Sequence, residues 1–490
     1  MSSESSASEV PSAQQALAGR IPIPSQGRIF HTYREFLLTS ATLGSASYAY
    51  LVGASLVMIG TTWIAILGYM LGLVISTAFV TYTAGVISYR LGVDAVDAVK
   101  PALGTRGAIL VLIGVIASCA GWANVLLAMT ARGMTSLATE AHIGAGLQFE
   151  GEVIAFGIAL VALIWVLLRR GAKMMEKAAS YCAIAQIVLA LVVLGLIAKK
   201  FGLAATLLTN VAPEKAYTTN KLLQLAYAVE FGLTNGLGMF AFVGGLARLV
   251  KHRRHVVGPV VAGYAVLGAS FVAAVGALAA AATGKDDLGS LLTGVAGPIV
   301  GGVVLAVIMI TNVGTMVAQF YITGLAIQQI SLFARLRWPM VVASVLVPSL
   351  VIAFNTQWLL DRVMALLAYG GIMFVGVTAI MFVDYYVLRR QKVVAAHLFA
   401  SPGQGSYWFS AGVNWVAIFV IVLTSALYIV FFDPGTLRVS GPFAMFGASI
   451  PTLTVGALAY YVLMRLVIAR STVGGYRPSS AKPESVEVGL

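Results

Sequence analysis

Charged side chains are rare inside the apolar runs of this sequence, and Glu230 is the most informative of them. It begins the stretch EFGLTNGLGMFAFVGGLARLVK (230–251), which is apolar enough to enter a lipid bilayer. A carboxylate at membrane depth is a functional candidate by default, because burying its charge is costly. Glu230 could bind a coupling cation, relay a proton or accept hydrogen bonds from the N–H groups of a ligand. The alternative is a hydrated position near the extracellular end of the helix.

An aromatic side chain offers a second kind of chemistry in the apolar run 107–131. Trp122 lies in the middle of this run, away from the membrane interfaces where Trp usually occurs. The other residues on its helical face are Ser118, Val125, Leu126 and Met129, with Asn124 to the side. Trp122 could therefore stack on a flat ring, or it could pack in the protein interior.

A polar stripe follows one face of the apolar run 298–331. Its members recur at helical spacing and are Thr311, Asn312, Thr315, Gln319 and Thr323. Hard cations prefer oxygen ligands, and the Thr315 hydroxyl would suit Na+. The same stripe could instead hold membrane helices together, through contacts of about 0.6 kcal/mol each.

Glycine interrupts the run that contains Glu230. Gly232, Gly236 and Gly238 each lower helix propensity by roughly 1 kcal/mol relative to Ala. Thr234 and Asn235 carry side chains that can take over freed backbone hydrogen bonds. Unwound backbone at membrane depth is tolerated only where it is buried in protein or lines a water-filled cavity. We therefore expect a broken helix and a binding site here.

A second interrupted run has the sequence LLTSATLGSASYAYLVGASLVMI (37–59), in which Gly44, Ser45, Ala46 and Ser47 break the apolar pattern. A pair of interrupted segments at corresponding places in two halves of a chain predicts the binding site of a secondary transporter. Gly and Ser are also common where membrane helices pack closely, so each run alone leaves both interpretations open.

Composition restricts the class of protein. The 490 residues are 59% hydrophobic and 10% charged, which is typical of a polytopic membrane protein. The net charge of +13 lies in short connections between apolar runs, so nucleic acid is not an expected partner. Cys119 and Cys182 lie within apolar runs, which leaves no disulfide framework or metal cluster. The motifs GxxxxGK[ST], HExxH and GxSxG do not occur, so we expect neither an enzyme nor a cofactor other than a coupling ion.

Windows of about 20 apolar residues indicate twelve membrane spans. The windows are 37–59, 63–88, 107–131, 152–169, 177–198, 222–247, 257–282, 298–331, 338–354, 358–388, 408–432 and 441–468. With the N-terminus inside, most of the 31 Lys and Arg residues fall in cytoplasmic connections, in agreement with the positive-inside rule. The basic connection 199–221 is assigned outside and is the exception. We predict a multi-pass protein in the lipid bilayer of the cell membrane (plasma or inner), with both termini cytoplasmic.

The two interrupted runs are spans one and six, which suggests a division of this all-α chain into repeats. Inverted five-span repeats would bring both breaks to the middle of the membrane. The predicted parts are a disordered cytoplasmic N-terminal tail (1–34), a first five-helix repeat (35–200), a second five-helix repeat (201–392), helices eleven and twelve (393–470) and a disordered cytoplasmic C-terminal tail (471–490).

Two motifs beside these spans carry a resemblance to a known family. Span ten ends in DYYVLRR (384–390), followed by Leu398, Tyr407 and GVNW (412–415), and spans two and three are joined by RLGV (90–93) and GTRG (104–107). With the twelve-span layout, these motifs resemble the nucleobase:cation symporter-1 family, which includes cytosine, purine, uracil, allantoin and hydantoin permeases. The resemblance implies a LeuT-type fold with five-plus-five inverted repeats and two extra C-terminal helices. It also implies a small-molecule substrate between spans one, three, six and eight, with Na+ or H+ as the coupling ion.

The resemblance implies roles for single residues as well. Ala41 and Gly44 would offer backbone carbonyls to Na+, Ser45 would face the substrate, and Trp122 would stack on it. Two adjacent hydroxyl residues of the family fall at Gly314 and Thr315, so one hydroxyl is missing, while Thr311 keeps the position of a carbonyl ligand.

Two departures from the family pattern affect this interpretation. The missing hydroxyl favours H+ over Na+ as the coupling ion, with Glu230 as the group that carries the proton. In span six the second aromatic wall is absent from its expected place, and the nearest match runs from Asn235 to Met239, so an amide or a sulfur replaces a ring.

The leading hypothesis is a symporter that imports a small planar nitrogen heterocycle, such as a nucleobase, hydantoin or allantoin, by alternating access. Trp122 would stack on the ring, and Asn235, Asn312 and Gln319 would read its edge by hydrogen bonds. Asn124 and Met239 are further predicted substrate contacts. An amino-acid or amine transporter of the same fold is the alternative, and a channel or receptor without coupled flux is a third interpretation. The sequence leaves the oligomeric state open.

Overall fold

The computed structural model describes residues 22–143, 146–212, 214–433, 438–439, 444–470 and 473–476. The predicted tail residues 1–21, 471–472 and 477–490 and the start of the twelfth window, 441–443, lie outside the described residues. Within the described part, eight helices are long and apolar enough to cross a membrane, two bent helix pairs pass the same test together, and two shorter helices are also apolar. These elements account for the twelve predicted spans.

The first five spans follow the predicted windows. They are α2 (Tyr33–Ser45) with α3 (Tyr48–Leu56); α4 (Thr62–Val80) with the π-helical turn η3 (Thr81–Gly85) and α5 (Val86–Leu91); α8 (Ala108–Glu140); α9 (Phe149–Leu168); and α10 (Ala172–Phe201).

The remaining spans begin with the second bent pair, α12 (Lys221–Gly238) and α13 (Phe240–Ala247). They continue with α14 (Val257–Val260), the π-helical segment η5 (Val261–Ser270) and α15 (Phe271–Thr283); α17 (Pro298–Ile327); α19 (Trp338–Ala353); α21 (Val363–Phe382) with the π-helical turn η6 (Val383–Leu388); α22 (Trp415–Phe431); and α23 (Ser449–Arg470).

Short elements fill the connections. They are η1 (Ser25–Gly27), η2 (Val57–Ile59), α6 (Ala95–Ala98), α7 (Lys100–Leu103), α11 (Leu203–Leu207), η4 (Arg253–His255), α16 (Leu288–Ala296), α18 (Ser331–Ala334), α20 (Thr356–Leu360), η7 (Ala395–Phe399) and η9 (Val473–Gly475). One antiparallel pair of two-residue strands, β1 (Phe432–Asp433) with β2 (Arg438–Val439), departs from the all-α prediction.

Several window boundaries are wrong by more than three residues, among them the end of window three, because α8 continues to Glu140. Two of the errors, in windows eight and eleven, have a local reason. Window eight ran to residue 331, but α17 ends at Ile327 and a separate turn, α18, follows. Window eleven began at residue 408, but α22 starts only at Trp415. Ala411 and Gly412 both have positive φ, of 53° and 86°, so the backbone turns there and cannot be helical.

Helix contacts occur in matched pairs. Span one (α2, α3) packs on span seven (η5, α15), and α4 of span two packs on α12 of span six. Helix α10 of span five contacts α2 and α17, while α21 of span ten contacts α12 and α8. If spans one to five are exchanged with spans six to ten, the contact of span one with span seven becomes the contact of span six with span two. The contacts of span five become those of span ten in the same way. This is the pattern expected of two five-span repeats related by a two-fold axis.

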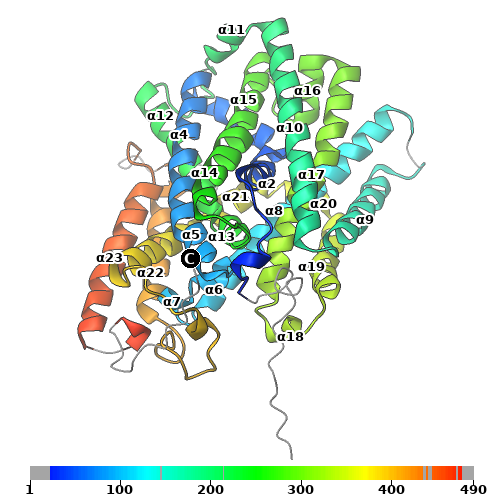
Figure 1. Ribbon diagram of the computed structural model, residues 1–490. Coiled ribbons are helices and arrows are strands. Elements are labelled where there is room, and N and C mark those ends of the chain that lie inside the picture. Colours follow the sequence, from blue (N-terminus) through cyan, green and yellow to red (C-terminus); the bar gives the residue numbers. More distant parts are fainter. Residues whose placement is uncertain are drawn as a thin grey trace, which may run out of the picture.

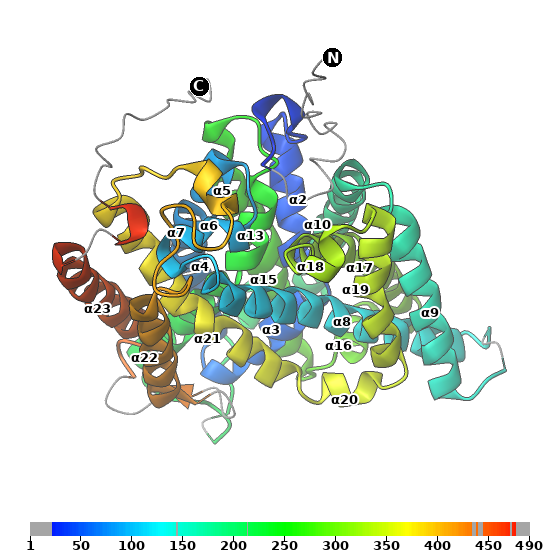
Figure 2. The same cartoon turned by 90° about the horizontal axis from the view of Figure 1, so that it is seen from below.

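Helices α22 and α23 follow the second repeat and lie at one edge of the helix bundle, on the opposite side from α9 (Figures 1 and 2). Both contact α21, and they contact each other. The two extra C-terminal helices therefore extend the bundle at the end of span ten.

The prediction of disordered tails at 1–34 and 471–490 is wrong for those tail residues that the structure describes. Ile23 and Phe30 are buried, and Phe30 exchanges backbone hydrogen bonds with Leu249 and Lys251 beyond span six. Helix α2 begins where a capping box forms, because the side chains of Thr32 and Glu35 bond each other's backbone N–H groups.

Beyond span twelve, η9 also packs on the protein. The Tyr476 hydroxyl donates a hydrogen bond of 2.5 Å to Asp384 Oδ1. Residues 22–32 and 473–476 are therefore docked segments, because apolar and hydrogen-bonding partners are available at that end of the bundle.

Candidate functional site

The break in span one lies where it was predicted. Helix α2 ends at Ser45, α3 begins at Tyr48, and the two helices are bent by 59°. Asn312 of α17 reaches this break: its Oδ1 accepts from Ser47 N at 3.0 Å, and its Nδ2 donates to Ser47 Oγ at 2.9 Å. Freed backbone polarity is thus satisfied by a side chain from span eight.

The structure therefore places the Asn312 side chain at the break and outside the lining of the central pocket. Its Nδ2 also donates to Thr130 Oγ1 of α8 at 3.0 Å, its side chain is fully buried, and it does not line the central pocket. The predicted polar stripe does hold helices together at this position, which was the alternative interpretation.

The break in span six lies closer to the C-terminus than predicted. Helix α12 continues to Gly238, Met239 separates it from α13, and the bend is 42°. A Cβ added to Gly238 would meet no atom within 4 Å, because this residue faces the pocket. Gly232 and Gly236 instead belong to the helix and allow close packing, since a Cβ on Gly232 would lie 2.1 Å from the Tyr69 carbonyl of α4.

Thr234 and Asn235 also differ from their predicted role of bonding freed backbone. Thr234 Oγ1 donates to the carbonyl of Glu230 within the same helix, at 3.0 Å. Asn235 bonds two tyrosine side chains, because at this position α12 is still regularly helical and has no backbone group to satisfy.

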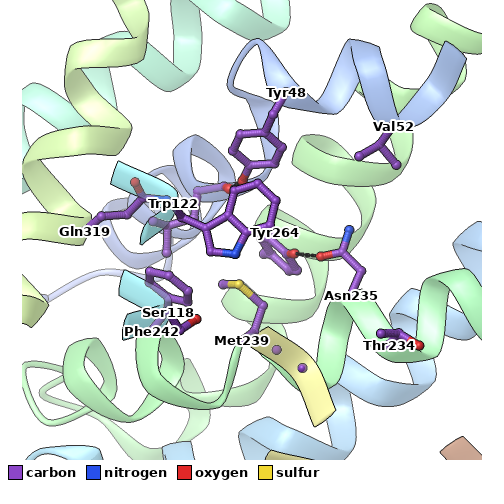
Figure 3. A pocket seen from close by; sticks show the side chains of 13 residues that line it. Tyr48, Val52, Ser118, Trp122, Thr234, Asn235, Met239, Phe242, Tyr264 and Gln319 are labelled. Atoms are coloured by element: carbon purple, nitrogen blue, oxygen red, sulfur yellow. Dashed lines mark hydrogen bonds between the residues drawn. The ribbon is translucent and has the colours of Figure 1, made fainter. Parts of the chain in front are cut away.

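The central pocket lies between the two breaks and is drawn in Figure 3. Spans one, three, six, seven and eight contribute to it through Tyr48, Trp122, Met239, Tyr264 and Gln319, among others. Its volume is about 40 Å³. A cavity of roughly 150 Å³ accommodates benzene, so a ring enters only if a flexible side chain moves. Met239 lies at the break and is the residue best suited to do so.

Aromatic rings form the walls of the pocket. Trp122 lies beside Tyr48, with ring centroids 5.1 Å apart and planes inclined by 45°. Phe242 and Tyr264 are also in the lining (Figure 3). The sequence predicted Trp122 but missed these three rings. Tyr48 follows the first break directly and Phe242 lies just after the second, and that placement could have identified them.

Two amides form the polar edge of the pocket. Asn235 Nδ2 donates to Tyr69 Oη at 2.6 Å, and Tyr264 Oη donates to Asn235 Oδ1 at 2.7 Å. Gln319 is 2% exposed and its Oε1 has no hydrogen-bond partner in the described part of the chain. A buried polar atom without a partner is costly, and a ligand N–H donor would satisfy it.

Two predicted substrate contacts point elsewhere. Ser45 Oγ donates to Gln186 Oε1 of α10 at 2.5 Å, and Asn124 Nδ2 donates to Ala120 O of its own helix at 2.8 Å. Neither residue lines the pocket. The Ser45 hydroxyl bonds a side chain of another helix, whereas the Asn124 amide bonds the backbone of its own helix, as short polar side chains often do.

The predicted ion-coupling residues are only partly brought together. Thr315 Oγ1 lies 2.7 Å from Thr42 O and 3.4 Å from Thr42 Oγ1. Thr42 was missed, although it lies next to the predicted Ala41. Gly314, where a hydroxyl is missing, packs on Cys182 of α10, since an added Cβ would lie 2.5 Å from that side chain.

The other predicted cation ligands face different neighbours. The Ala41 carbonyl and Gly44 pack against η5, because a Cβ on Gly268 would lie 2.6 Å from Ala41 O and a Cβ on Gly44 would lie 2.5 Å from Ala269 N. For Thr311 the prediction concerns the carbonyl, which stays a prediction; its hydroxyl bonds the carbonyls of its own preceding turn at 2.9 and 3.0 Å.

Glu230 lies outside the central pocket. It is only 1% exposed, so the alternative prediction of a hydrated position near the end of the helix is wrong. Its carboxylate accepts from Ser449 N at 3.0 and 3.1 Å, from Ser449 Oγ at 2.7 Å and from Tyr428 Oη at 3.1 Å. Ser449 is the first residue of α23, so Glu230 accepts from an N–H group that has no partner within that helix. A negative charge is favourable at a helix N-terminus.

Asp384 has a structural environment too. It is buried and its Oδ2 lies 2.6 Å from Nε of Arg389. Arg389 also donates to the carbonyls of Gly474 and Pro101, at 2.7 and 2.5 Å. This pair joins the end of span ten to two other segments of the protein.

Residues 22–456 match the family model described as permease for cytosine/purines, uracil, thiamine, allantoin. No curated protein sequence matches the chain significantly.

Solved structures support the fold. Mhp1, a nucleobase-cation-symport-1 family transporter, matches in a closed conformation with bromovinylhydantoin bound at TM-score 0.72 and 15% identity, over 93% of this chain and 98% of that one. Its inward-facing conformation matches at TM-score 0.69 and 15% identity, over 94% and 98%. A Na+-coupled sialic acid symporter in a substrate-bound outward-open state matches at 0.58 and 12% identity, over 92% of each chain.

These likenesses confirm the predicted twelve-helix LeuT-type fold. The protein is a multi-pass membrane transporter and not an enzyme. Because the family model covers most of its length, the chain belongs to the permease family for cytosine and purines, uracil, thiamine and allantoin.

Proposed function

We propose that this protein imports a small planar nitrogen heterocycle by alternating access, together with a cation. The observation that carries the proposal is the unpartnered Oε1 of Gln319, which lies in the same small pocket as the Trp122 ring. An aromatic face and an amide edge together suit a flat ring with N–H and C=O groups. Membership of the permease family supports this substrate class.

The pocket supports a heterocycle better than an amino acid. None of its described lining residues is charged, so no side chain is available to pair with a zwitterion. Trp122 and Tyr48 would hold the ring by stacking, while Gln319 and the amide of Asn235 would select its edge. A site with buried polar groups discriminates strongly against analogues that lack the matching group.

The test compares two tryptophans. Trp122→Ala should weaken uptake and binding of the heterocycle about fivefold to a hundredfold, since stacking on a base contributes about 1–3 kcal/mol. Trp165→Ala is the control, because Trp165 lies on α9 and donates to Pro339 O at 3.2 Å, away from the pocket. Uptake of radiolabelled nucleobases and hydantoins into proteoliposomes gives the affinities. Equal KM values for the two variants would exclude the stacking role, and competition by amino acids alone would favour the alternative substrate.

We further propose Na+ as the coupling ion. Thr42 O, Thr42 Oγ1 and Thr315 Oγ1 form a compact group of neutral oxygens between spans one and eight, which fits a hard cation. When bound there, Na+ would supply positive charge that holds the broken span one against span eight. The described pocket lining contains no acid to carry a proton, and both oxygens of Glu230 already accept hydrogen bonds.

A matched pair of threonines tests this ion. Thr315→Val removes the hydroxyl that faces Thr42, whereas Thr311→Val removes one that bonds only its own helix. Stimulation of uptake by Na+ relative to choline should disappear in the first variant and persist in the second. Na+-independent uptake by the unaltered protein that follows a pH gradient would favour H+ instead.

We propose, in addition, that both termini are cytoplasmic. The distribution of Lys and Arg supports this orientation.

A further inference from the structure

A second and larger hollow lies at one end of spans two, seven and ten. It has a volume of about 530 Å³, and its polar lining consists of Tyr82, Arg90, Arg253, Arg254, Tyr386 and Gln391. We call it the basic groove. It shares no lining residue with the central pocket, so substrate binding does not account for it.

Its charge is positive and not neutralised by the protein. The lining contains three arginines and no acid. No ion pair within the described ranges involves Arg90, Arg253 or Arg254. Arg389, at the end of the same span ten, is by contrast paired with buried Asp384. The basic groove therefore has a net attraction for an anion.

One of the three arginines is held in place by neutral groups. Arg90 Nη1 donates to Tyr385 Oη at 2.9 Å and to Gln391 Oε1. These contacts orient the guanidinium without cancelling its charge. Arg253 and Arg254 belong to the exposed turn η4 and face the same hollow. Arg binds phosphate in a bidentate manner, which suits this arrangement.

The backbone around the groove is irregular on two sides. Tyr82 lies in the π-helical turn η3, Tyr386 lies in η6, and the Tyr386 hydroxyl donates to the Tyr82 carbonyl at 2.7 Å. Arg390 and Gln391 both have positive φ, of 51° and 65°. π-helical turns and such backbone conformations are frequent at functional sites.

The surroundings favour a lipid over a free anion. Beside the charged end, Tyr82, Phe382 and Val387 are 51%, 37% and 45% exposed, on spans that cross the membrane. Acyl chains would cover these side chains while the headgroup entered the groove. Basic pockets between membrane helices on the cytoplasmic side bind anionic headgroups, and the charge distribution predicts that this end is cytoplasmic.

We propose that the basic groove binds the phosphate headgroup of an anionic phospholipid from the cytoplasmic leaflet. The headgroup would connect the end of span two, the start of span seven and the end of span ten. These elements come from both repeats, so a bound lipid would stabilise one arrangement of the two. Free phosphate shares the headgroup chemistry and is distinguished by experiment.

The experiment uses the full chain purified in detergent and measures its thermal unfolding midpoint. The probes are phosphatidylglycerol, phosphatidylcholine and inorganic phosphate, each over a range of concentrations. The test variant is R253Q/R254Q. The matched control is R335Q/R337Q, which removes two exposed arginines from the connection between spans eight and nine.

Phosphatidylglycerol should stabilise the unaltered protein and the control variant more than phosphatidylcholine does. The test variant should need about tenfold or more phosphatidylglycerol for the same shift, because each basic residue near an anionic surface contributes about 1 kcal/mol. Added NaCl should weaken the effect by screening. If R253Q/R254Q does not fold, Gln391→Glu places a carboxylate beside Arg90 and should weaken phosphatidylglycerol binding in the same way.

Two results would overturn the proposal. One is equal stabilisation by the two lipids, or an unchanged phosphatidylglycerol response in the test variant. The other is full stabilisation by inorganic phosphate alone, which would assign the groove to a free anion. Because the groove and the central pocket are separate, neither result would affect the proposed substrate.

Discussion

Identical side chains in this protein have opposite roles, as Asn124 and Asn235 illustrate. Asn235 joins two tyrosine hydroxyls at the pocket edge, whereas the Asn124 amide donates to its own helix. The difference lies in what each side chain can reach, because both residues sit on apolar helices. The role of each asparagine therefore depends on its neighbours. Substituting the two asparagines one at a time tests this difference.

Asn235→Ala should raise the KM for uptake of the heterocycle about tenfold or more, because it leaves Tyr69 and Tyr264 without their amide partner and removes a polar edge of the site. Proteoliposome uptake measures this change. Asn124→Ala should leave the KM unchanged, since Ala has the higher helix propensity and no pocket contact is lost. A comparable KM increase in both variants would contradict the assignment.

Glu230→Gln should lower thermal stability, by about 1–3 kcal/mol, because an amide nitrogen would face the Ser449 N–H and hydroxyl donors. The dependence of uptake on Na+ or pH should stay as it is in the unaltered protein. Thermal unfolding and ion-jump uptake are the two measurements. Loss of the ion dependence without loss of stability would instead make Glu230 the coupling group.

At the scale of elements, glycine decides which helices approach closely. A Cβ on Gly72 of α4 would lie 2.0 Å from the Val229 carbonyl of α12. That neighbour is backbone, so the helices themselves would have to separate. Gly195 of α10 would meet nothing within 4 Å. The same residue type therefore has a packing role in one helix and none in the other.

Gly72→Ala should destabilise the protein by about 1–3 kcal/mol through overpacking, while Gly195→Ala should be neutral or stabilising by up to about 1 kcal/mol through helix propensity. Unfolding midpoints in detergent provide the comparison. If both substitutions had the same sign, the α4 and α12 contact would not be as close as described.

For the protein as a whole, we predict an orientation in the membrane with both termini in the cytoplasm. In a variant with Cys119→Ala and Cys182→Ala, a single cysteine replaces Asp286, before α16, or Gln404, after η7; both residues are exposed. A membrane-impermeant thiol reagent added to right-side-out cells should label Asp286→Cys and spare Gln404→Cys, because an odd number of spans precedes the first and an even number the second. The reverse labelling pattern would place the termini outside.

Several features followed from the sequence alone. Apolar windows determined the twelve spans, since every spanning helix needs about 20 apolar residues whatever its neighbours are. The break at Ser45 to Ser47 and the pocket residues Trp122, Asn235, Met239 and Gln319 were also predicted. These predictions rest on local chemistry: lost helix propensity, and polar or aromatic groups at positions where lipid would not accept them.

Which polar groups remain free for a ligand depends instead on packing between distant segments. Asn312, Ser45 and Glu230 were functional candidates in the sequence, as Gln319 was, yet each of the three is hydrogen-bonded to a distant segment. Tyr48, Thr42 and the basic groove were missed because their partners are about 70 to 300 residues away. The spacing of residues along one helix shows which of them share a face. Which element covers that face depends on how the two repeats pack together.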